Sequence, residues 1–346
     1  MQIRIIITVV PCMRSIILCT VFSLVSSATV AQSLNVYSFR KAELIRPLIT
    51  QFEQQTGITV NLVSGKADHL IKRLAADGKK SHADVLLTVD VARLENAKKL
   101  GLLSPINSDK LNRNIPATLR DKDNYWFGLS IRARTLFVAK ERVNFLNLKD
   151  YLDLAHPQWR GKICIRKGTH YYNRSMVAAL IHNNGYEATK NWIEAISKNL
   201  AKRPNGGDRD QLRSLAAGYC DIALANSYYY GMLAASPKAL DRKVYDQVAI
   251  LWPNQSKAGT HVNISGAAMT KASKNKQQAI AFIEYLTTKE AQKTYSETNF
   301  EYPVRADIKP SEMLTTWGRF KGDKQAITQL TKYHAQATAL IKSSNW

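Results

Sequence analysis

The stretch Trp126-Phe-Gly-Leu-Ser-Ile-Arg-Ala-Arg-Thr-Leu-Phe-Val-Ala139 decides the fold of this 346-residue chain. It is a long extended segment, and we interpret it as a strand that crosses from one lobe to another. The stretch Thr260-His-Val-Asn-Ile-Ser-Gly-Ala-Ala-Met269 has the pattern of the return strand. Two crossings predict two lobes joined by a hinge, with a ligand cleft between them. The length agrees, because 346 residues are more than one core usually holds.

Strands alternate with helices on both sides of the crossing stretch, which indicates a largely parallel α/β sheet. Before it, the hydrophobic periodicity predicts strands at 34–38, 58–63 and 83–89 and helices that end near Gly57, Gly78 and Gly101. After it, we expect strands at 161–166 and 220–225 and helices at 175–182 and 187–200. We assign residues 32–133 and 260–308 to an N-terminal lobe, and residues 134–259 and 309–346 to a C-terminal lobe.

Residues 1–31 have the order of a secretory signal peptide: basic residues, a short apolar run, then small residues. The apolar run is too short for a comfortable membrane span. Cys19 could suggest a lipoprotein, but Leu18 stands before it where a small residue is expected. We therefore predict export to the periplasm and removal of this segment.

The chain carries a formal net charge of +22, and loss of Arg4 and Arg14 with the signal peptide leaves +20. Such a charge usually indicates nucleic acid or a membrane surface as partner. Export and the even spread of Lys and Arg argue against nucleic acid. We favour a solvated basic surface, and a second reading is that its field attracts anionic chelates or an acidic membrane.

Two cysteines, Cys164 and Cys220, remain after signal removal, an even count in an oxidising compartment. Each lies shortly upstream of a tyrosine cluster. We expect a disulfide between them, and the alternative is two buried free thiols packed as small hydrophobic groups.

The sequence contains no pattern typical of an enzyme. It has no phosphate-binding loop, no Gly-x-Ser-x-Gly and no Cys-x-x-Cys, and its seven histidines are scattered without zinc-site spacing. We therefore expect a binding protein. An exported hydrolase remains the weaker alternative.

Two tyrosine clusters follow directly on predicted buried strands: Tyr171 and Tyr172 on one, and Tyr228, Tyr229 and Tyr230 on the other. In open α/β sheets, ligands bind beyond the carboxyl ends of the strands. Both clusters therefore fall where a ligand would lie. Ser227 is a plausible helix N-cap, and a helix that starts there would turn successive tyrosines toward one cleft.

Phenol oxygens suit ferric iron, which prefers hard anionic oxygen ligands, whereas ferrous iron, zinc and copper favour imidazole or thiolate. A bound cation can deprotonate a phenol at neutral pH although the ordinary pKa is near 10. Tyrosines are also common in clefts for organic ligands. From the residues alone, a metal role and an organic-ligand role stay equally open.

The mature chain resembles the periplasmic ferric-iron-binding proteins of bacterial ABC transporters, from about residue 34 to about residue 304. The segments that carry the resemblance are 36–40, 65–68, 88–90, 128–134, 206–208, 226–229, 259–263, 265–266 and 302–303. The resemblance implies two α/β lobes that close on the ligand, and cargo delivery to a permease in the inner membrane. We expect the chain to act as a monomer.

The resemblance places the paired iron-binding tyrosines of the family on Tyr228 and Tyr229, and a third, followed by Asn, on Tyr172. Tyr230 then packs behind them. Family members also bind carbonate or a similar anion beside the metal, and Arg40 and Arg132 match positions suited to hold it.

One departure concerns the first lobe. Some members place a His-Tyr pair where this chain has Lys41 and Ala42, and neither residue can replace a phenolate. The chain therefore resembles the subgroup with three tyrosines from the second lobe plus an anion, which Lys41 could help to neutralise. The alternative cargo on the same fold is a small organic or anionic solute, such as thiamine, a polyamine or a phosphonate.

Overall fold

A computed structural model of the chain describes residues 1–2, 32–144, 148–344 and 346. The predicted signal peptide lies outside these residues, apart from its first two. Within the described part of the chain, no helix is both long enough and apolar enough to cross a membrane. The two-lobed α/β fold that the sequence predicts is confirmed.

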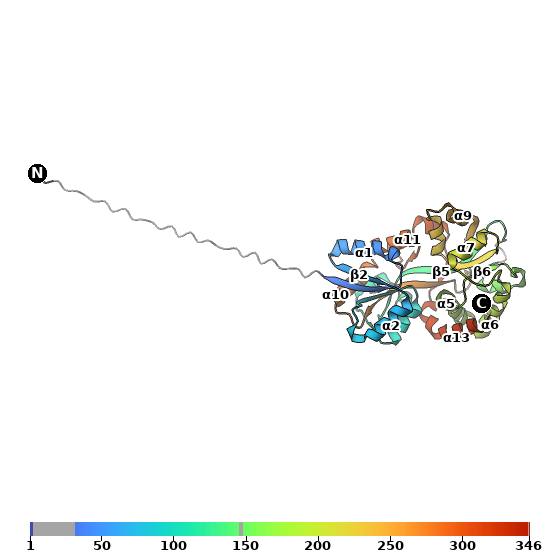
Figure 1. The fold of residues 1–346 in the computed structure, drawn as a ribbon, viewed down its shortest axis with the longest axis horizontal. Coiled ribbons are helices and arrows are strands. Elements are labelled where there is room, and N and C mark those ends of the chain that lie inside the picture. The colour runs from blue at the N-terminus through green and yellow to red at the C-terminus, as the bar shows by residue number, and fades with distance from the viewer. Residues whose placement is uncertain (3–31, 145–147, 345) are drawn as a thin grey trace. The chain divides into compact units, whose positions relative to one another are not determined.

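Two long strands run through the middle of the sheet, β5 (Phe127–Ala139) and β9 (Thr260–Thr270), and all their residues are buried (Figure 1). They pair antiparallel with each other from Phe127 to Ala133. From Arg134 onward, β5 pairs instead with β7 (Ile222–Asn226). Strand β5 thus changes its pairing partner from β9 to β7 between Ala133 and Arg134. The two predicted crossing strands, 126–139 and 260–269, correspond to β5 and β9.

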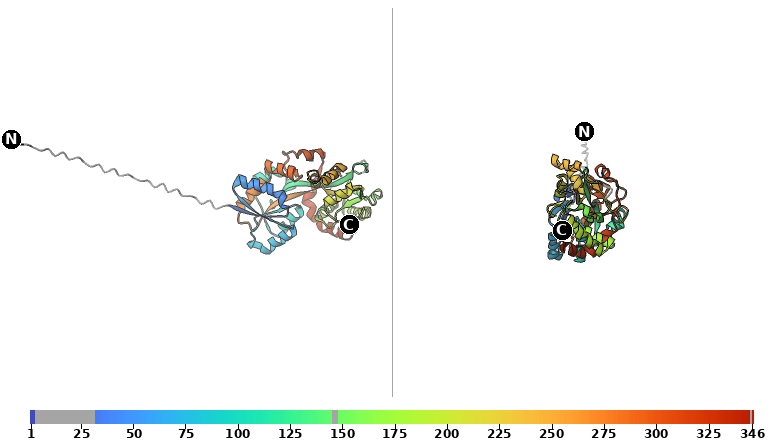
Figure 2. Two further views of the ribbon diagram at one scale, coloured as in Figure 1. Left: turned by 45° about the horizontal axis from the view of Figure 1, so that its top comes forward. Right: turned by 90° about the vertical axis from the view of Figure 1, so that its right-hand side faces the viewer.

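The first half of the sheet has the order β2-β1-β3-β9-β5. Its other strands are β1 (Ser33–Ser38), β2 (Thr59–Ser64) and β3 (Val85–Thr88). Its helices are α1 (Ala42–Thr56), α2 (Ala67–Asp77), α3 (Val91–Lys99), α10 (Lys276–Tyr285) and α11 (Lys289–Thr298). They lie on both faces of the strands (Figure 2). The ring of Phe52 in α1 packs 5.0 Å from that of Phe282 in α10.

The second half continues through β7 to β6 (Ile163–Ile165), with β8 (Val248–Leu251) on the far part of β5. Its helices are α5 (Tyr171–Asn184), α6 (Tyr186–Asn199), α7 (Asp208–Ala216), α8 (Tyr228–Ala234), α9 (Ala239–Gln247) and α13 (Leu330–Lys342). The C-terminal helix α13 packs along α5, so the chain returns to this half at its end.

Shorter strands and α-helices are β4 (Leu103–Ser104), α4 (Asp109–Asn114), β10 (Tyr302–Pro303), α12 (Glu312–Thr316) and β11 (Gly322–Asp323). Each of the three short strands pairs with β5 or β9. The two crossing strands β5 and β9 therefore belong to both halves of the sheet, and the short strands pair with them.

The predicted largely parallel sheet is wrong in one respect. Strands β1, β2 and β3 are parallel, as are β6 and β7, but β5 and β9 run antiparallel to their main neighbours. The sheet is mixed because a crossing strand must return in the opposite direction. Helix α5 also starts earlier than predicted, at Tyr171 and not near residue 175.

The predicted disulfide between Cys164 and Cys220 is confirmed, with a Cα–Cα distance of 5.9 Å. Cys164 lies in the middle of β6, and Cys220 lies two residues before β7. The bond therefore joins the two parallel strands from which the tyrosine-bearing helices follow. Both cysteines are almost fully buried.

We expect the double variant Cys164→Ala/Cys220→Ala to lose about 2–4 kcal/mol of unfolding free energy, because the bond closes a loop across a sequence separation of 56 residues. Urea unfolding of the oxidised wild type and the variant measures the loss. A transition midpoint unchanged from that of the wild type would contradict the expectation.

Candidate functional site

The two tyrosine clusters lie at the start of two neighbouring helices. Strands β6 and β7 are parallel and hydrogen-bonded, so their carboxyl ends point the same way. Helix α5 follows β6 and begins with Tyr171 and Tyr172, and helix α8 follows β7 and begins with Tyr228 and Tyr229. Tyr172 thus lies in the first turn of a helix.

The hydroxyl groups of Tyr172 and Tyr228 are hydrogen-bonded at 2.6 Å. The ring of Tyr229 lies 4.2 Å from that of Tyr228, and the ring of Tyr171 lies 4.3 Å from that of Tyr172. Tyr172 and Tyr228 are 7% and 8% exposed, whereas Tyr229 and Tyr171 are half-buried. The structure therefore brings the three predicted tyrosines together and adds Tyr171 at their side.

Burial raises the pKa of all four phenols above the ordinary value. It is the largest cause for Tyr172, Tyr228, Tyr229 and Tyr171 alike. Hydrogen bonds to Tyr228 and Tyr172 oppose the shift at Tyr229 without reversing it. At neutral pH the cluster is therefore a set of neutral phenols, and it becomes anionic only when a cation stabilises the phenolates.

The start of helix α5 is held by His170, whose Nδ1 accepts a hydrogen bond from the Tyr172 backbone N–H at 3.3 Å. Burial, followed by the charge of Arg166, lowers the pKa of His170 to about 2. The imidazole therefore stays neutral and keeps Nδ1 available as an acceptor. His170 caps the helix that carries Tyr172, a role that the sequence reasoning missed.

The start of helix α8 differs from the prediction in its cap. Ser227 stands directly before the helix, as expected, but its hydroxyl makes no capping hydrogen bond. It accepts instead from the backbone N–H of Ala133 at 3.2 Å, and the Ser227 N–H donates to the Ala133 carbonyl at 2.8 Å. The residue ties α8 to β5 at the point where β5 changes partner.

Tyr230 faces away from the other tyrosines. Its hydroxyl donates to the carbonyls of Tyr245 and Val248, at 3.1 and 2.9 Å. Its ring packs 4.2 Å from the ring of Tyr245 and 5.3 Å from that of Phe137. This agrees with the expectation that Tyr230 is packing behind the cluster.

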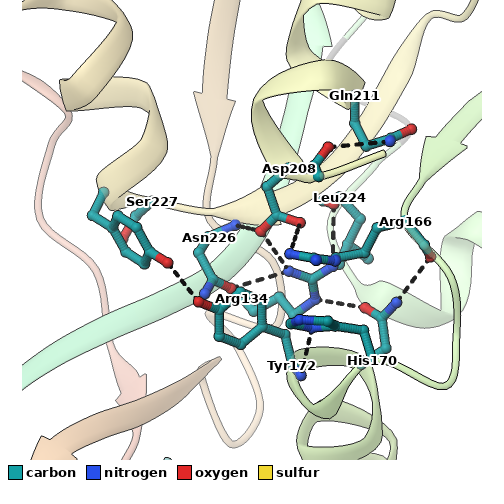
Figure 3. A network of polar contacts seen from close by, with 12 residues as sticks. Arg134, Arg166, His170, Tyr172, Asp208, Gln211, Leu224, Asn226 and Ser227 are labelled. Atoms are coloured by element: carbon teal, nitrogen blue, oxygen red, sulfur yellow. Dashed lines mark hydrogen bonds and ion pairs between the residues drawn. The ribbon is translucent and has the colours of Figure 1, made fainter. Parts of the chain in front are cut away.

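A buried ion pair underlies both clusters (Figure 3). Arg134 on β5 contacts Asp208 at 3.0 Å between Nη1 and Oδ2, and the two side chains are 2% and 0% exposed. Arg134 also donates through Nε to Asn173 at 2.7 Å and through Nη1 to Asn226 at 3.0 Å. Asp208 accepts from the Asn226 backbone N–H at 2.9 Å and faces Arg166 at 3.4 Å.

The asparagines in this network stand next to the tyrosines in the chain. Asn173 follows Tyr172, and Asn226 precedes Tyr228 by two residues. The Arg134–Asp208 pair therefore fixes the backbone from which each tyrosine projects. Segments 128–134 and 206–208 carry the resemblance, but the sequence alone predicts no role for Arg134 or Asp208.

Three guanidinium groups surround the ring of Tyr172. Those of Arg166, Arg132 and Arg134 lie 5.3, 5.7 and 5.8 Å from its centroid. Fixed positive charge at this distance favours a phenolate over a phenol and partly offsets the effect of burial. The three arginines would thus stabilise a negative charge on the Tyr172 oxygen.

The two predicted anion-binding arginines differ in what they contact. Arg40 forms an ion pair with the buried Glu301 at 2.8 Å and donates to Ser265 at 2.9 Å. Arg132 donates only a long 3.3 Å hydrogen bond to the same Ser265, and its buried Nη2 has no hydrogen-bond partner in the described part of the chain. Glu301, which sequence reasoning missed, thus already supplies an internal carboxylate to Arg40.

A small cavity of about 10 Å³ lies beside Tyr172, Arg132 and His261. Its lining carries three buried nitrogen atoms that have no hydrogen-bond partner among the described residues: Arg132 Nη2, Asn226 Nδ2 and His261 Nδ1. Burial, followed by the charges of Arg134 and Arg132, lowers the pKa of His261 to about 3, so the imidazole is neutral. A cavity of this size is at the lower limit for one water molecule.

Lys41 does not face the tyrosines. Its ammonium group is exposed and pairs with Glu43 at 3.3 Å, so it is a solvated surface charge. Among the described residues, no three His, Cys, Asp or Glu side chains gather where they could hold a metal ion. The phenols are the oxygen donors that this part of the chain brings together.

A two-lobed α/β chain with polar side chains gathered at the carboxyl ends of its strands has the architecture of a solute-binding protein. The sequence pattern of one such family matches residues 47–322. The chain belongs to this family, the bacterial extracellular solute-binding proteins.

Similar proteins of known name agree with the predicted resemblance. Iron uptake protein A1 of Synechocystis sp. is 38% identical over 315 residues, which cover 91% of this chain and 88% of that protein. A ferric binding protein from Campylobacter jejuni is 40% identical with a TM-score of 0.86, and a Trichodesmium protein solved with iron and citrate ligands is 43% identical with the same score. In both cases the match covers 90% of this chain and 98% of the other.

We expect Asp208→Asn to destabilise the fold by about 3–5 kcal/mol, because it leaves Arg134 buried without its counter-charge. The matched control is Asp307→Asn, which removes a 2.7 Å ion pair with Arg305 from a carboxylate that is 53% exposed and should cost far less. Thermal unfolding of both variants tests this. Equal losses would mean that the buried pair has no special role.

Proposed function

We propose that this protein is the exported binding component of an ABC importer for ferric iron. Phenolate oxygens of Tyr172, Tyr228 and Tyr229 hold the ion in the cleft. The observation that carries the proposal is the hydrogen bond between the Tyr172 and Tyr228 hydroxyls, with Tyr229 beside both. Phenol oxygens that lie this close can bind one cation after a small adjustment.

The chemistry of the donors favours Fe(III) over other cargo. It is a hard cation, and three phenolates would balance its three positive charges. Nearby arginines lower the cost of the phenolate form. The names of the similar proteins support the same cargo, since they describe iron uptake and ferric iron binding.

Carbonate or a similar anion completes the coordination in this proposal. Arg132 is the principal residue for it, because its Nη2 is buried, unpartnered and lies beside Tyr172. Arg40 contributes less, since Glu301 occupies both of its terminal nitrogens. Only its Nε is without a partner in the described chain.

The lobes in this proposal are residues 32–133 with 260–308, and 134–259 with 309–346. The change of strand partner between Ala133 and Arg134 supports the first border. A buried hydrogen bond of 2.8 Å from Ser175 to Asp90 joins the two lobes near the cluster. The lobes close on iron in the periplasm, and the loaded monomer delivers it to a membrane permease without catalysing a reaction.

We expect ferric salt with bicarbonate to produce a visible phenolate-to-iron charge-transfer band in the metal-free protein. Tyr228→Phe should weaken binding at least tenfold and change the band, because it removes one oxygen ligand. Tyr230→Phe is the matched control and should leave both unchanged, since that hydroxyl contacts only backbone carbonyls. The same band and affinity in Tyr228→Phe would refute the site.

We also expect iron binding to weaken as the pH falls. Burial raises the phenol pKa values, so the free cluster is protonated at neutral pH and must release a proton for each phenolate formed. Calorimetry in buffers of different ionisation enthalpy counts the protons released from one ferric source. The wild type and Tyr230→Phe should release about one proton more than Tyr228→Phe. An equal count for all three would contradict phenolate ligation.

A further inference from the structure

A second pocket lies between the lobes, and its lining includes none of the three proposed iron ligands, although helix α5 carries both Tyr172 and two of the lining residues. Its volume is about 250 Å³. Arg93, Asn96 and Lys99 of α3 line it from one lobe, and Tyr171 and Arg174 of α5 and His334 of α13 line it from the other. Helix α3 also packs directly against α13.

The pocket has more positive charge than its acidic residues neutralise. Arg93 Nη1 and Arg174 Nε are buried nitrogen atoms without hydrogen-bond partners in the described chain. The solvent-exposed Lys99 makes no ion pair or hydrogen bond with its side chain among the same residues. Three cationic side chains therefore line the pocket. Two of them, Arg93 and Arg174, each have a buried N–H donor without a hydrogen-bond partner in the described chain.

The two carboxylates of the lining are already engaged. Asp90 accepts hydrogen bonds from the Ala92 backbone, from Ser175 and from Asn263, all between 2.8 and 2.9 Å. Asp68 pairs with Arg93 at 3.4 Å from a side chain that is 69% exposed. Neither carboxylate neutralises Lys99 or Arg174.

Arg93 is held in a fixed orientation by two aromatic rings. Its guanidinium carbon lies 4.4 Å from the ring centroid of Phe39 and 4.0 Å from that of Tyr171. The two rings come from different lobes and meet edge to face at 5.8 Å. A guanidinium that stacking has oriented loses little entropy when it binds a planar anion.

We propose that this pocket binds a small polycarboxylate anion of the size of citrate. Guanidinium groups pair with carboxylates through two parallel hydrogen bonds, and the pocket offers one such group from each lobe. The anion would link Arg93 with Arg174 and so join the two lobes beside the tyrosine cluster.

The size and layout of the pocket favour a polycarboxylate over a compact anion. Its volume is somewhat below the roughly 300–1,000 Å³ typical of small-molecule sites, and corresponds to about eight water molecules at roughly 30 Å³ each. The lining presents cationic groups from α3 and from α5, and two or three carboxylates on a short carbon skeleton can pair with both sets at once.

The inference does not depend on the proposed iron cargo, because it predicts binding by the metal-free protein. The experiment is titration calorimetry of iron-free protein with citrate at low ionic strength, with inorganic phosphate as the second probe. We expect citrate to bind at one site per chain, and phosphate to bind at least tenfold more weakly.

The test variants are Lys99→Gln and Arg174→Gln, neither of which removes an ion pair. Each should weaken citrate binding at least fivefold. The matched control is Lys198→Gln/Lys238→Gln, which removes two exposed positive charges outside the pocket and should leave citrate affinity within twofold of the wild type.

Three outcomes would overturn the inference: no citrate binding by the wild type, no effect of either pocket variant, or an equal loss in the control, which would indicate attraction by net charge alone. The ferric charge-transfer band in bicarbonate is recorded for every variant and should not change. A protein that binds citrate in this pocket but shows no such band would contradict the iron proposal and leave this one standing.

Discussion

The buried ion pair between Arg134 and Asp208 is the constraint on which the rest of the site depends. Taking two charges out of water is costly, so the fold must supply each with a close partner and further hydrogen bonds. It does so by bringing β5, the start of α7, the end of β7 and the start of α5 to one point. Once these four elements meet there, the first turns of α5 and α8 have little freedom, and the tyrosines that they carry are forced into contact.

Local patterns in the sequence predict much of this arrangement. The crossing strands are long and continuous, and the tyrosines follow directly on buried strands, so their place at the edge of the sheet needs only the rule for α/β folds. The pairing of Arg40 with Glu301 could not be predicted, because the two residues lie 261 positions apart and meet only in the folded chain. The same holds for Ser227, whose hydroxyl found a partner on β5, and for the early start of α5, which rests on His170.

Burial raises the pKa of the phenols in the cleft and lowers the pKa of the imidazoles. It keeps the phenols and the imidazoles of His170 and His261 neutral, while the arginines around them stay charged. The free tyrosine cluster therefore carries no negative charge of its own and is flanked by arginines, although its proposed cargo is a cation. This combination favours an ion that arrives together with an anion, and the basic pocket between α3 and α5 extends the same preference beyond the tyrosines.

The change of partner along β5 has a mechanical meaning. Tyr172, Tyr228 and Tyr229 all come from elements that are joined to the far part of β5, beyond Ala133, and the disulfide binds their two parent strands to each other. A rotation at the crossing strands would move these three oxygens as one rigid body. Opening of the lobes would then alter the access of water and competing chelators, while the distances between the oxygens stay the same. In the proposed function, the cargo would be released when these oxygens become exposed to solvent, and the other lobe would cover them in the closed form.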